Sequence, residues 1–392
     1  MATSLKKKYF SGLSTNTFLL TLTSLFADIS TEMLYPVLPI FLTQNLKAPG
    51  SVVGIIEGVA IATQNIVQGL AGWLSDKLQK RKPIAVAGYT LAAIAKPLIG
   101  FSIVWQGVFT ARFLDRLGSG TRSAPRDALV AASAGERHRG KAFGLEGVGD
   151  NLGAFLGPLI AVALLFYFKV EIRSIFYLAF IPGLIAVFMV LLVKEKGNKI
   201  PVKYKLDTHI QRFPLNYWHY LAIIAIFGMG NVSSSFFILQ TKAVGVSLEG
   251  TILIYALYNL MAALISFPSG YLSDMLGRKT VLSASFLIFL ATAAGFAITK
   301  NMLVIGALFA LYGLYQGIFR SVGKAFATDF VPPYMRASGV GWYNTTVGLS
   351  GLVASVIAGL LWDNIGHSAV FFYAAFFAGA GSIALLFLRK IK

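Results

Sequence analysis

Long apolar runs separated by short polar turns make up most of this sequence. Residues 281–299 and 371–388 are two of these runs, and each reaches the ~18 residues that suggest a membrane-crossing helix. Inside lipid every backbone polar group must be satisfied internally, so these runs must be helical. The pattern predicts an all-α membrane protein with twelve transmembrane helices, at 15–43, 52–74, 84–104, 106–126, 141–168, 173–193, 218–241, 250–273, 280–299, 302–327, 337–362 and 368–388.

The composition is typical of a chain dissolved in lipid. Of 392 residues, 56% are hydrophobic and 13% are charged, against roughly 25% charged in an average soluble domain. The basic start at Lys6 leads into an apolar segment without a small-residue cleavage site, so we expect a first span and not a removed signal peptide. With no cysteine, disulfides and thiolate metal sites are excluded.

One long polar stretch divides the apolar runs into two sets. A loop sequence recurs in both sets: Gly72-Trp-Leu-Ser-Asp76 returns as Gly270-Tyr-Leu-Ser-Asp274, an offset of 198 positions. In transporters built from such repeats, the substrate site lies at the interface between them. The repeat predicts three regions, an N-terminal six-helix bundle over 1–193, a cytoplasmic linker over 194–217 and a C-terminal six-helix bundle over 218–392.

Basic clusters occupy every second connection between the predicted spans. They include 77–82, the linker and the tail 389–392, whereas the alternate connections carry only isolated cations. By the positive-inside rule both termini are cytoplasmic, and we expect a multi-pass protein of the cell (inner) membrane. The net charge of +18 then reflects contact with anionic membrane lipids and not with nucleic acid.

The repeated loop motif resembles the signature of the major facilitator superfamily between spans two and three, Gly-x-Leu-Ala-Asp-x-x-Gly-Arg-Lys. In the first copy Gln79 and Lys80 replace its second glycine and its arginine. The resemblance implies a major facilitator fold with two pseudo-symmetric halves, and a gating role for the loop. The gating residues it implies are Gly72, Asp76 and Lys80 with Asp127 as their partner, and Gly270, Asp274 and Arg278 in the second copy.

The fourth predicted span contains Arg112-Phe-Leu-Asp115-Arg116-Leu-Gly118-Ser-Gly, which resembles the superfamily pattern Arg-x-x-Gln-Gly-x-Gly. The resemblance implies a role for Arg112 in proton coupling. Asp115 and Arg116 replace the glutamine and the glycine of the pattern. Because adjacent positions do not share a helix face, one of these two side chains should face the cavity or another helix.

In the fifth predicted span, Gly144, Gly153, Gly157 and Pro158 are similar to the superfamily's antiporter motif. Glycines allow helices to approach closely, and proline bends the helix that contains it. The resemblance implies a transporter that exports a solute in exchange for protons.

Two carboxylates in the first predicted span, Asp28 and Glu32, are spaced i, i+4 and so lie on one helix face. A charge at the bilayer centre costs at least ~2.5–3.5 kcal/mol, so such groups usually line a cavity, form a pair or carry protons. Two close carboxylates also resist double ionisation. They are the leading candidates for the proton site, although Asp28 could instead neutralise a cation such as Arg112 or Arg116.

Other polar residues of the predicted spans are candidates for the substrate cavity. Lys96 and Lys324 are expected to extend toward a membrane interface instead. The cavity candidates are Asp115, Arg116, Glu146, Asp150, Asn151, Asn231, Tyr255, Asn259, Arg320 and Asn344.

Several function classes lack their motifs in this sequence. The sequence lacks a phosphate-binding loop, so we do not expect an ATP-driven pump. The four histidines lack metal-ligand spacing, and no nucleophile is accompanied by a base. We therefore expect no metal, no cofactor and no enzymatic activity. The expected function is proton-coupled export of a small organic solute or drug by alternating access, with the solute, protons and lipids as partners of a monomer. Two alternatives stay open, a proton-coupled importer of an organic anion or siderophore-like solute, and a lipid flippase.

Overall fold

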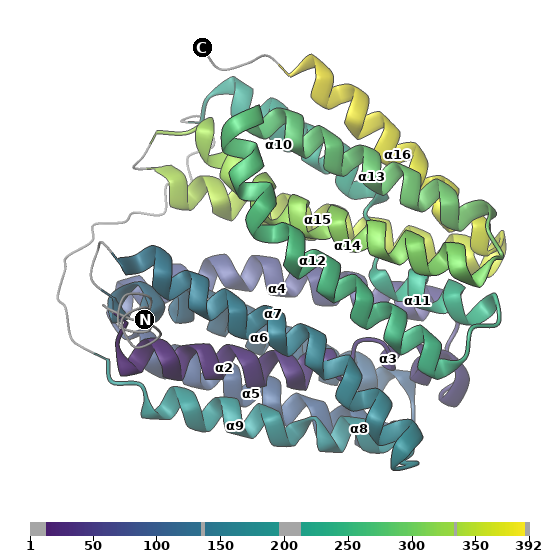
Figure 1. Cartoon of the computed structure of the whole chain (residues 1–392), viewed down its shortest axis with the longest axis horizontal. Coiled ribbons are helices and arrows are strands. Elements are labelled where there is room, and N and C mark those ends of the chain that lie inside the picture. The colour runs from purple at the N-terminus through teal and green to yellow at the C-terminus, as the bar shows by residue number, and fades with distance from the viewer. Residues whose placement is uncertain (1–12, 135–137, 196–212, 333–334, 389–392) are drawn as a thin grey trace, which may run out of the picture.

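The computed structural model describes residues 13–134, 138–195, 213–332 and 335–388, and all regular elements in these ranges are helices. Most of the predicted linker, 196–212, lies outside the described residues, as does the basic tail 389–392. The helices form two bundles, one on each side of this linker (Figure 1).

The N-terminal half contains six helical segments, three of which are divided. In order they are α2 (Thr15–Glu32) with α3 (Leu38–Ile40) and the π-helical turn η1 (Phe41–Asn45), α4 (Gly50–Leu78), α5 (Arg81–Phe101), α6 (Trp105–Ser133), α7 (Arg139–Val162) with η3 (Ala163–Tyr167), and α8 (Ile172–Leu178) with α9 (Phe180–Leu192).

The C-terminal half repeats this arrangement, and only its first segment is divided. Its helices are α10 (Leu215–Gly230) with α11 (Ser234–Ala243), α12 (Leu248–Leu276), α13 (Arg278–Ile298), α14 (Met302–Asp329), α15 (Arg336–Asn364) and α16 (His367–Phe387).

The predicted all-α architecture is confirmed, and the twelve predicted spans correspond to these segments. Within the described residues, ten segments are long and apolar enough to cross a membrane. The segment from α2 to η1 and helix α6 complete the set. The first is interrupted after Glu32, and α6 carries many charged side chains, so both lack a long uncharged apolar stretch.

Two of the predicted continuous helices are broken at equivalent positions, which corrects the spans 15–43 and 218–241. The first break covers 33–37 and contains Pro36; the second covers 231–233 and follows Gly230. Proline removes a backbone donor and glycine weakens a helix interior, which explains both sites. Position 33 shifted by the repeat offset of 198 is position 231. Paired interruptions of this kind point to the binding site of a transporter.

The two halves pack closely at one end and diverge toward the other (Figure 1). The end where α9 stops and α10 starts is the linker end, and the opposite end is the distal end. Near the distal end the Asp363 carboxylate accepts hydrogen bonds from the backbone N–H groups of Gly50 and Ser51, both at 2.7 Å. A Cβ on Gly58 would lie 2.9 Å from the Leu352 carbonyl oxygen. Helices α4 and α15 are therefore in backbone contact there.

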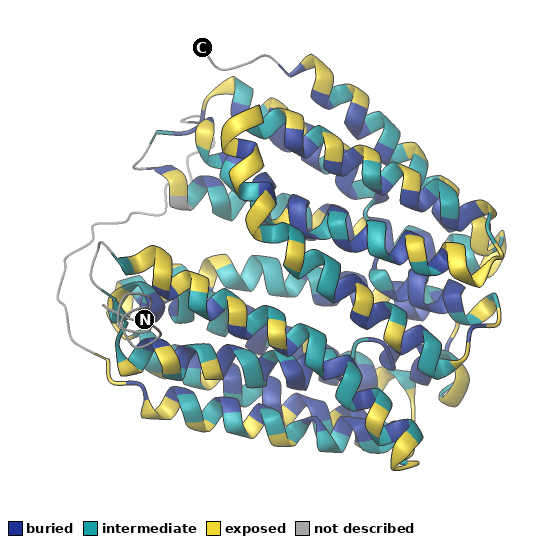
Figure 2. Cartoon of the chain, viewed as in Figure 1, coloured by how far each residue is buried: buried dark blue, intermediate teal, exposed yellow. Residues whose placement is uncertain are grey.

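The outer surface of both bundles is apolar, as lipid contact requires. Large side chains such as Phe267, Leu303 and Phe387 are more than four-fifths exposed. Figure 2 shows exposed positions along the outward-facing helices and buried positions between them. A soluble monomer rarely exposes so much contiguous apolar surface, so this surface is suited to lipid.

Packing at the distal end provides a conformational test. A Cβ on Gly54 would meet the backbone carbonyl oxygen of Ser355 at less than any normal contact distance. Gly54→Leu should therefore overpack the interface by about 1–3 kcal/mol. The chain has no cysteine, so the thiol introduced by Ser355→Cys reports opening of the contact between α4 and α15. When Gly54→Leu is added, we expect maleimide labelling of this thiol to rise on the order of 10-fold. Gly69, which faces open space on the same helix, gives the matched control Gly69→Leu. Equal labelling in both variants would contradict the role of the distal contact.

Candidate transport site

Glu32 lies where α2 ends and contacts both halves of the protein. Its carboxylate accepts a hydrogen bond from the Tyr255 hydroxyl at 2.9 Å and another from the Asn259 amide at 3.2 Å. The same amide nitrogen lies 2.9 Å from the Ala154 carbonyl oxygen of α7. Glu32 therefore joins α2 to α12 of the C-terminal half beside the first helix break, and Asn259 joins α12 to α7.

Asp28 lies one turn earlier on the same face of α2. Its carboxylate is 3.8 Å from the Arg122 guanidinium, and its side chain is 21% exposed. The Asp150 carboxyl group on α7 interacts electrostatically with it. Two close carboxylates resist double ionisation. The arrangement is therefore suited to holding a proton between α2 and α7.

Glycines of α7 allow it to pack directly on the part of α2 that carries these acids. A Cβ on Gly153 would lie 2.9 Å from the Asp28 Cβ, and a Cβ on Gly157 would lie 2.9 Å from the Glu32 Cβ. Gly144 faces open space, so its role in the predicted motif has no packing counterpart. Pro158 is buried one residue after Gly157, and α7 continues past it to Val162.

A dense ionic cluster is buried inside the N-terminal half, around α6. Arg112 donates two hydrogen bonds to Glu57, each 3.1 Å, and a third to Asp115 at 3.0 Å. Arg116 bonds Gln64 at 2.9 Å. Both guanidinium groups lie over the Tyr35 ring, at 4.7 and 5.1 Å from its centre. The Arg112 and Glu57 side chains are at most 2% exposed, so this is a desolvated ion pair.

The neighbours Asp115 and Arg116 each reach another helix, as their adjacent positions on α6 suggest. Asp115 lies 3.6 Å from Lys96 of α5, and Arg116 bonds Gln64 of α4. Arg116 Nε also lies 3.2 Å from Asp115, because a long side chain can fold back along the helix and reach its neighbour. The two side chains thus tie α6 to both α4 and α5.

The structure corrects the expectation for Lys96. Its side chain does not extend to a membrane interface, because it is 3% exposed and pairs with Asp115 inside the bundle. Asp28 does lie beside an arginine of α6, but this is Arg122 and neither of the two that the sequence suggested.

A second ionic cluster lies nearer the linker end of α6. Arg126 pairs with Glu146 at 2.6 Å, with Asp127 at 2.9 Å and with Asp150 at 3.6 Å. Ser24 of α2 donates a further hydrogen bond of 2.6 Å to Glu146. Asp127, the expected partner of the gating loop, is thus engaged with Arg126 in this conformation.

The repeated loop motif lies at the linker end in both halves. Asp76 pairs with Arg81 at 3.7 Å, and Lys80 stands directly before the first residue of α5. In the second copy Arg278 pairs with Asp329 at 2.6 Å and with Asp274 at 3.9 Å. Gly72 approaches Ala124 of α6, whereas Gly270 faces open space.

The C-terminal half contributes two cations to the space between the halves. Arg320 and Lys324 lie one turn apart on α14, both are exposed, and neither has a hydrogen bond or ion pair to any described residue. Arg320 interacts electrostatically with Tyr258 of its own half and with Asp150 and Glu32 across the gap. Among the other candidates, Asn231 lies in the second helix break, Asn344 is buried, and Asn151 is half-buried on α7.

Four residues of the site are not among those that the sequence predicts: Tyr35, Gln64, Arg122 and Arg126. The spacing of polar residues in α6 does indicate the two arginines. Positions 112, 116, 119, 122 and 126 repeat at helical spacing and place a polar stripe along one face of α6. Tyr35 and Gln64 carry no comparable signal, since single aromatic and amide residues are frequent in membrane helices. In the described part of the chain, groups of three or more potential metal-ligating side chains do not occur.

Comparison with known proteins assigns this architecture to a family. The Major Facilitator Superfamily profile matches residues 20–241 and 218–392, nearly the whole sequence. The chain belongs to the major facilitator superfamily. An uncharacterised MFS-type transporter of Methanocaldococcus jannaschii is 34% identical over 384 residues, which is 96% of this chain and 95% of the relative.

Other similar proteins have named solutes. A probable 4-methylmuconolactone transporter of Cupriavidus pinatubonensis is 28% identical, over 80% of this chain and 76% of that one. The crystal structure of the nucleoside transporter NupG superposes with a TM-score of 0.78 at 15% identity, covering 97% of this chain and all of that one. At that identity the likeness concerns the fold. As a superfamily member the chain is a multi-pass membrane transporter of small molecules.

Proposed function

We propose that this transporter exports a small organic solute in exchange for protons, with Glu32 and Asp28 as the proton-binding groups. The observation that carries the proposal is the position of Glu32, which accepts hydrogen bonds from Tyr255 and Asn259 of the opposite half. A proton bound at this carboxylate alters a contact between the two bundles. An ion drives alternating access only if it binds one conformation better than the other, and this contact supplies such a difference.

Asp28 and Asp150 extend the same idea to the contact between α2 and α7. When both groups are ionised they repel, and Arg122 stands 3.8 Å from Asp28 as its counter-charge. Uptake of a proton exchanges this repulsion for a neutral contact. Gly153 brings the two helices close enough for that exchange to matter.

The direction of transport rests on two further features. Arg320 and Lys324 are exposed near the linker end of α14, the end that the basic residues of the sequence predict to be cytoplasmic, so the described conformation suits loading from inside. The glycine and proline spacing of α7 resembles the antiporter motif of exporters, and Gly153 and Gly157 pack on the two acids.

Purified protein in liposomes tests the proposal. A panel of small organic acids, lactones and nucleosides is screened first by thermal shift, because a ligand at 100 times its dissociation constant adds ~2.7 kcal/mol of stability. Ligands found in this way are then followed in vesicles with an imposed pH gradient. Solute movement opposite to the proton flux supports export, whereas movement with the protons would replace it by uptake.

Proton-coupled uptake of an organic anion is the second candidate, and Arg320 favours it. A cation within a span is costly, and the Arg320 side chain has no hydrogen bond or ion pair to any described residue. The solute of the Cupriavidus relative is likewise a small organic molecule. When Glu32 is protonated, Arg320 no longer faces that carboxylate charge and can bind an anion, so proton and anion would travel together.

A charge substitution separates the two candidates. If the solute is anionic, Arg320→Gln should weaken its binding by roughly 10- to 100-fold, the loss expected for one charge-assisted hydrogen bond. Binding is measured by isothermal titration or by competition. Lys300→Gln, which removes an exposed cation from the loop before α14, is the matched control. Equal affinities for Arg320→Gln and the unmodified protein would remove the anion hypothesis.

A further inference from the structure

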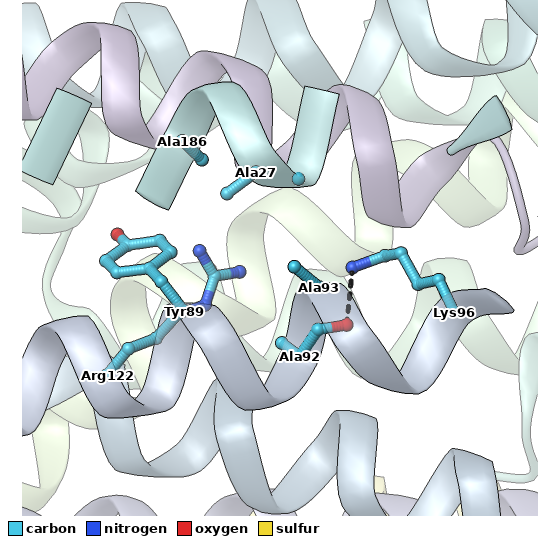
Figure 3. Close-up of a pocket in the computed structure, with 8 residues that line it drawn as sticks. Ala27, Tyr89, Ala92, Ala93, Lys96, Arg122 and Ala186 are labelled. Atoms are coloured by element: carbon cyan, nitrogen blue, oxygen red, sulfur yellow. Dashed lines mark hydrogen bonds between the residues drawn. The ribbon is translucent and has the colours of Figure 1, made fainter. Parts of the chain in front are cut away.

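A small pocket lies inside the N-terminal half, away from the space between the two bundles. It is enclosed by α2, α5, α6 and α9 (Figure 3). Small side chains leave the room: Ala27, Ala93 and Ala186 line its apolar wall. Three polar side chains complete the lining, Tyr89, Lys96 and Arg122. Of these lining residues, the proposed transport mechanism uses only Arg122, as the counter-charge of Asp28.

Several hydrogen-bond donors in the pocket lack an acceptor among the described residues. Arg122 Nε and Nη1 and the Tyr89 hydroxyl are buried and have no hydrogen-bond partner among the described residues. Lys96 Nζ has one long bond, 3.3 Å, to the Ala92 carbonyl oxygen. In Figure 3 the Arg122 guanidinium lies between the Tyr89 ring and Ala93, and the Lys96 ammonium points toward it. Buried donors of this kind normally have an acceptor.

The charges around the pocket are also unbalanced. Lys96, Arg112 and Arg116 share two carboxylates, those of Glu57 and Asp115, which leaves this group with a net charge of +1. Arg122 pairs separately with Asp28. Asp115 is shared among three of the cations, and Asp28 stands 3.8 Å from Arg122. Two cations that face each other in a low-dielectric interior repel strongly.

We propose that this pocket binds a monatomic anion, chloride under cellular conditions. An anion between these side chains accepts hydrogen bonds from the unmet Arg122 donors and from Lys96 and offsets the excess positive charge, which a water molecule does not do. The pocket has room for about one water-sized species, so sulfate, phosphate and organic anions are excluded by size. The bound anion lies between Lys96 and Arg122 and holds α5 to α6.

Thermal unfolding of the purified full chain tests the site. Chloride or bromide replaces gluconate at constant ionic strength, and we expect a saturable rise in Tm of roughly 2–4 °C with either halide. Sulfate, which does not fit, should give no saturable rise. A rise of the same size in gluconate, or no halide-specific rise, would overturn the proposal.

Variants locate the effect. Lys96→Met should remove the halide-dependent shift, whereas Lys300→Gln, which removes one exposed cation elsewhere, should keep it. Should Lys96→Met fail to fold, Arg122→Lys keeps the positive charge and removes the unmet guanidinium donors, and the halide concentration at half effect should rise about 5-fold, the equivalent of one hydrogen bond. An unchanged midpoint in Arg122→Lys would place the halide elsewhere.

Anomalous scattering from bromide-soaked crystals gives a direct readout. The expected result is a bromide peak between the Lys96 and Arg122 side chains. Density for water alone in the pocket, at halide concentrations that saturate the Tm shift, would contradict the assignment.

Discussion

Glu32→Gln should abolish solute movement driven by a pH gradient while the protein remains folded. The glutamine side chain keeps the size of glutamate and can still accept a hydrogen bond from Tyr255, so the contact between the halves survives in one fixed state. What is lost is the ability of a proton to change that contact. Protonation then no longer shifts the equilibrium between the conformations of alternating access. We therefore expect the solute flux driven by the pH gradient to fall by roughly 100-fold or more.

The measurement is solute flux in liposomes with an imposed pH gradient, beside a thermal unfolding curve for each variant. Asp28→Asn should behave in the same way, because Asp28 lies within reach of both Arg122 and Asp150. Glu249→Gln, at the start of α12 and outside the site, is the matched control and should transport normally. Unchanged gradient-driven flux in both Glu32→Gln and Asp28→Asn would exclude these acids as the coupling groups.

Much of the fold could be predicted from local patterns. Apolar runs of membrane length and the loop motif repeated at 72 and 270 specify the helices and their two sets, because both signals lie within short stretches of sequence. The i, i+4 spacing of Asp28 and Glu32 likewise places both acids on one face of α2. The break after Glu32 escapes prediction although Pro36 marks it, since the hydropathy of the segment continues across the break.

The partners of the charged side chains could not be predicted in the same way. Lys96 is expected from its sequence context to reach an interface, and it is held instead by Asp115, which lies on a neighbouring helix. Such pairs depend on how α5 and α6 are rotated relative to each other. Rotation is set by close packing, for instance of Gly88 on α5 against the Gly118 carbonyl oxygen, and single-helix patterns do not encode it.

The ionic cluster around Arg112 also separates a structural role from a coupling role. Resemblance to the superfamily implies that this arginine takes part in proton coupling. Its guanidinium is already bonded twice to Glu57 and once to Asp115, and the side chain is 1% exposed. We therefore propose that Arg112 fixes α6 against α4, and that the proton binds at the α2 carboxylates.

Arg112→Met should accordingly destabilise the protein by about 3–5 kcal/mol, because it leaves Glu57 buried without its counter-charge. Unfolding in detergent, followed by circular dichroism, measures the loss. The matched control is Arg81→Met, which removes an arginine from a partly exposed pair with Asp76 and should cost at most about 1 kcal/mol. The double variant Arg112→Met with Glu57→Leu should recover part of the loss, since no carboxylate is then left unpaired at that position. If Arg112→Met is as stable as Arg81→Met but fails to couple transport to protons, the arginine acts in the proton pathway and not as a structural ion pair.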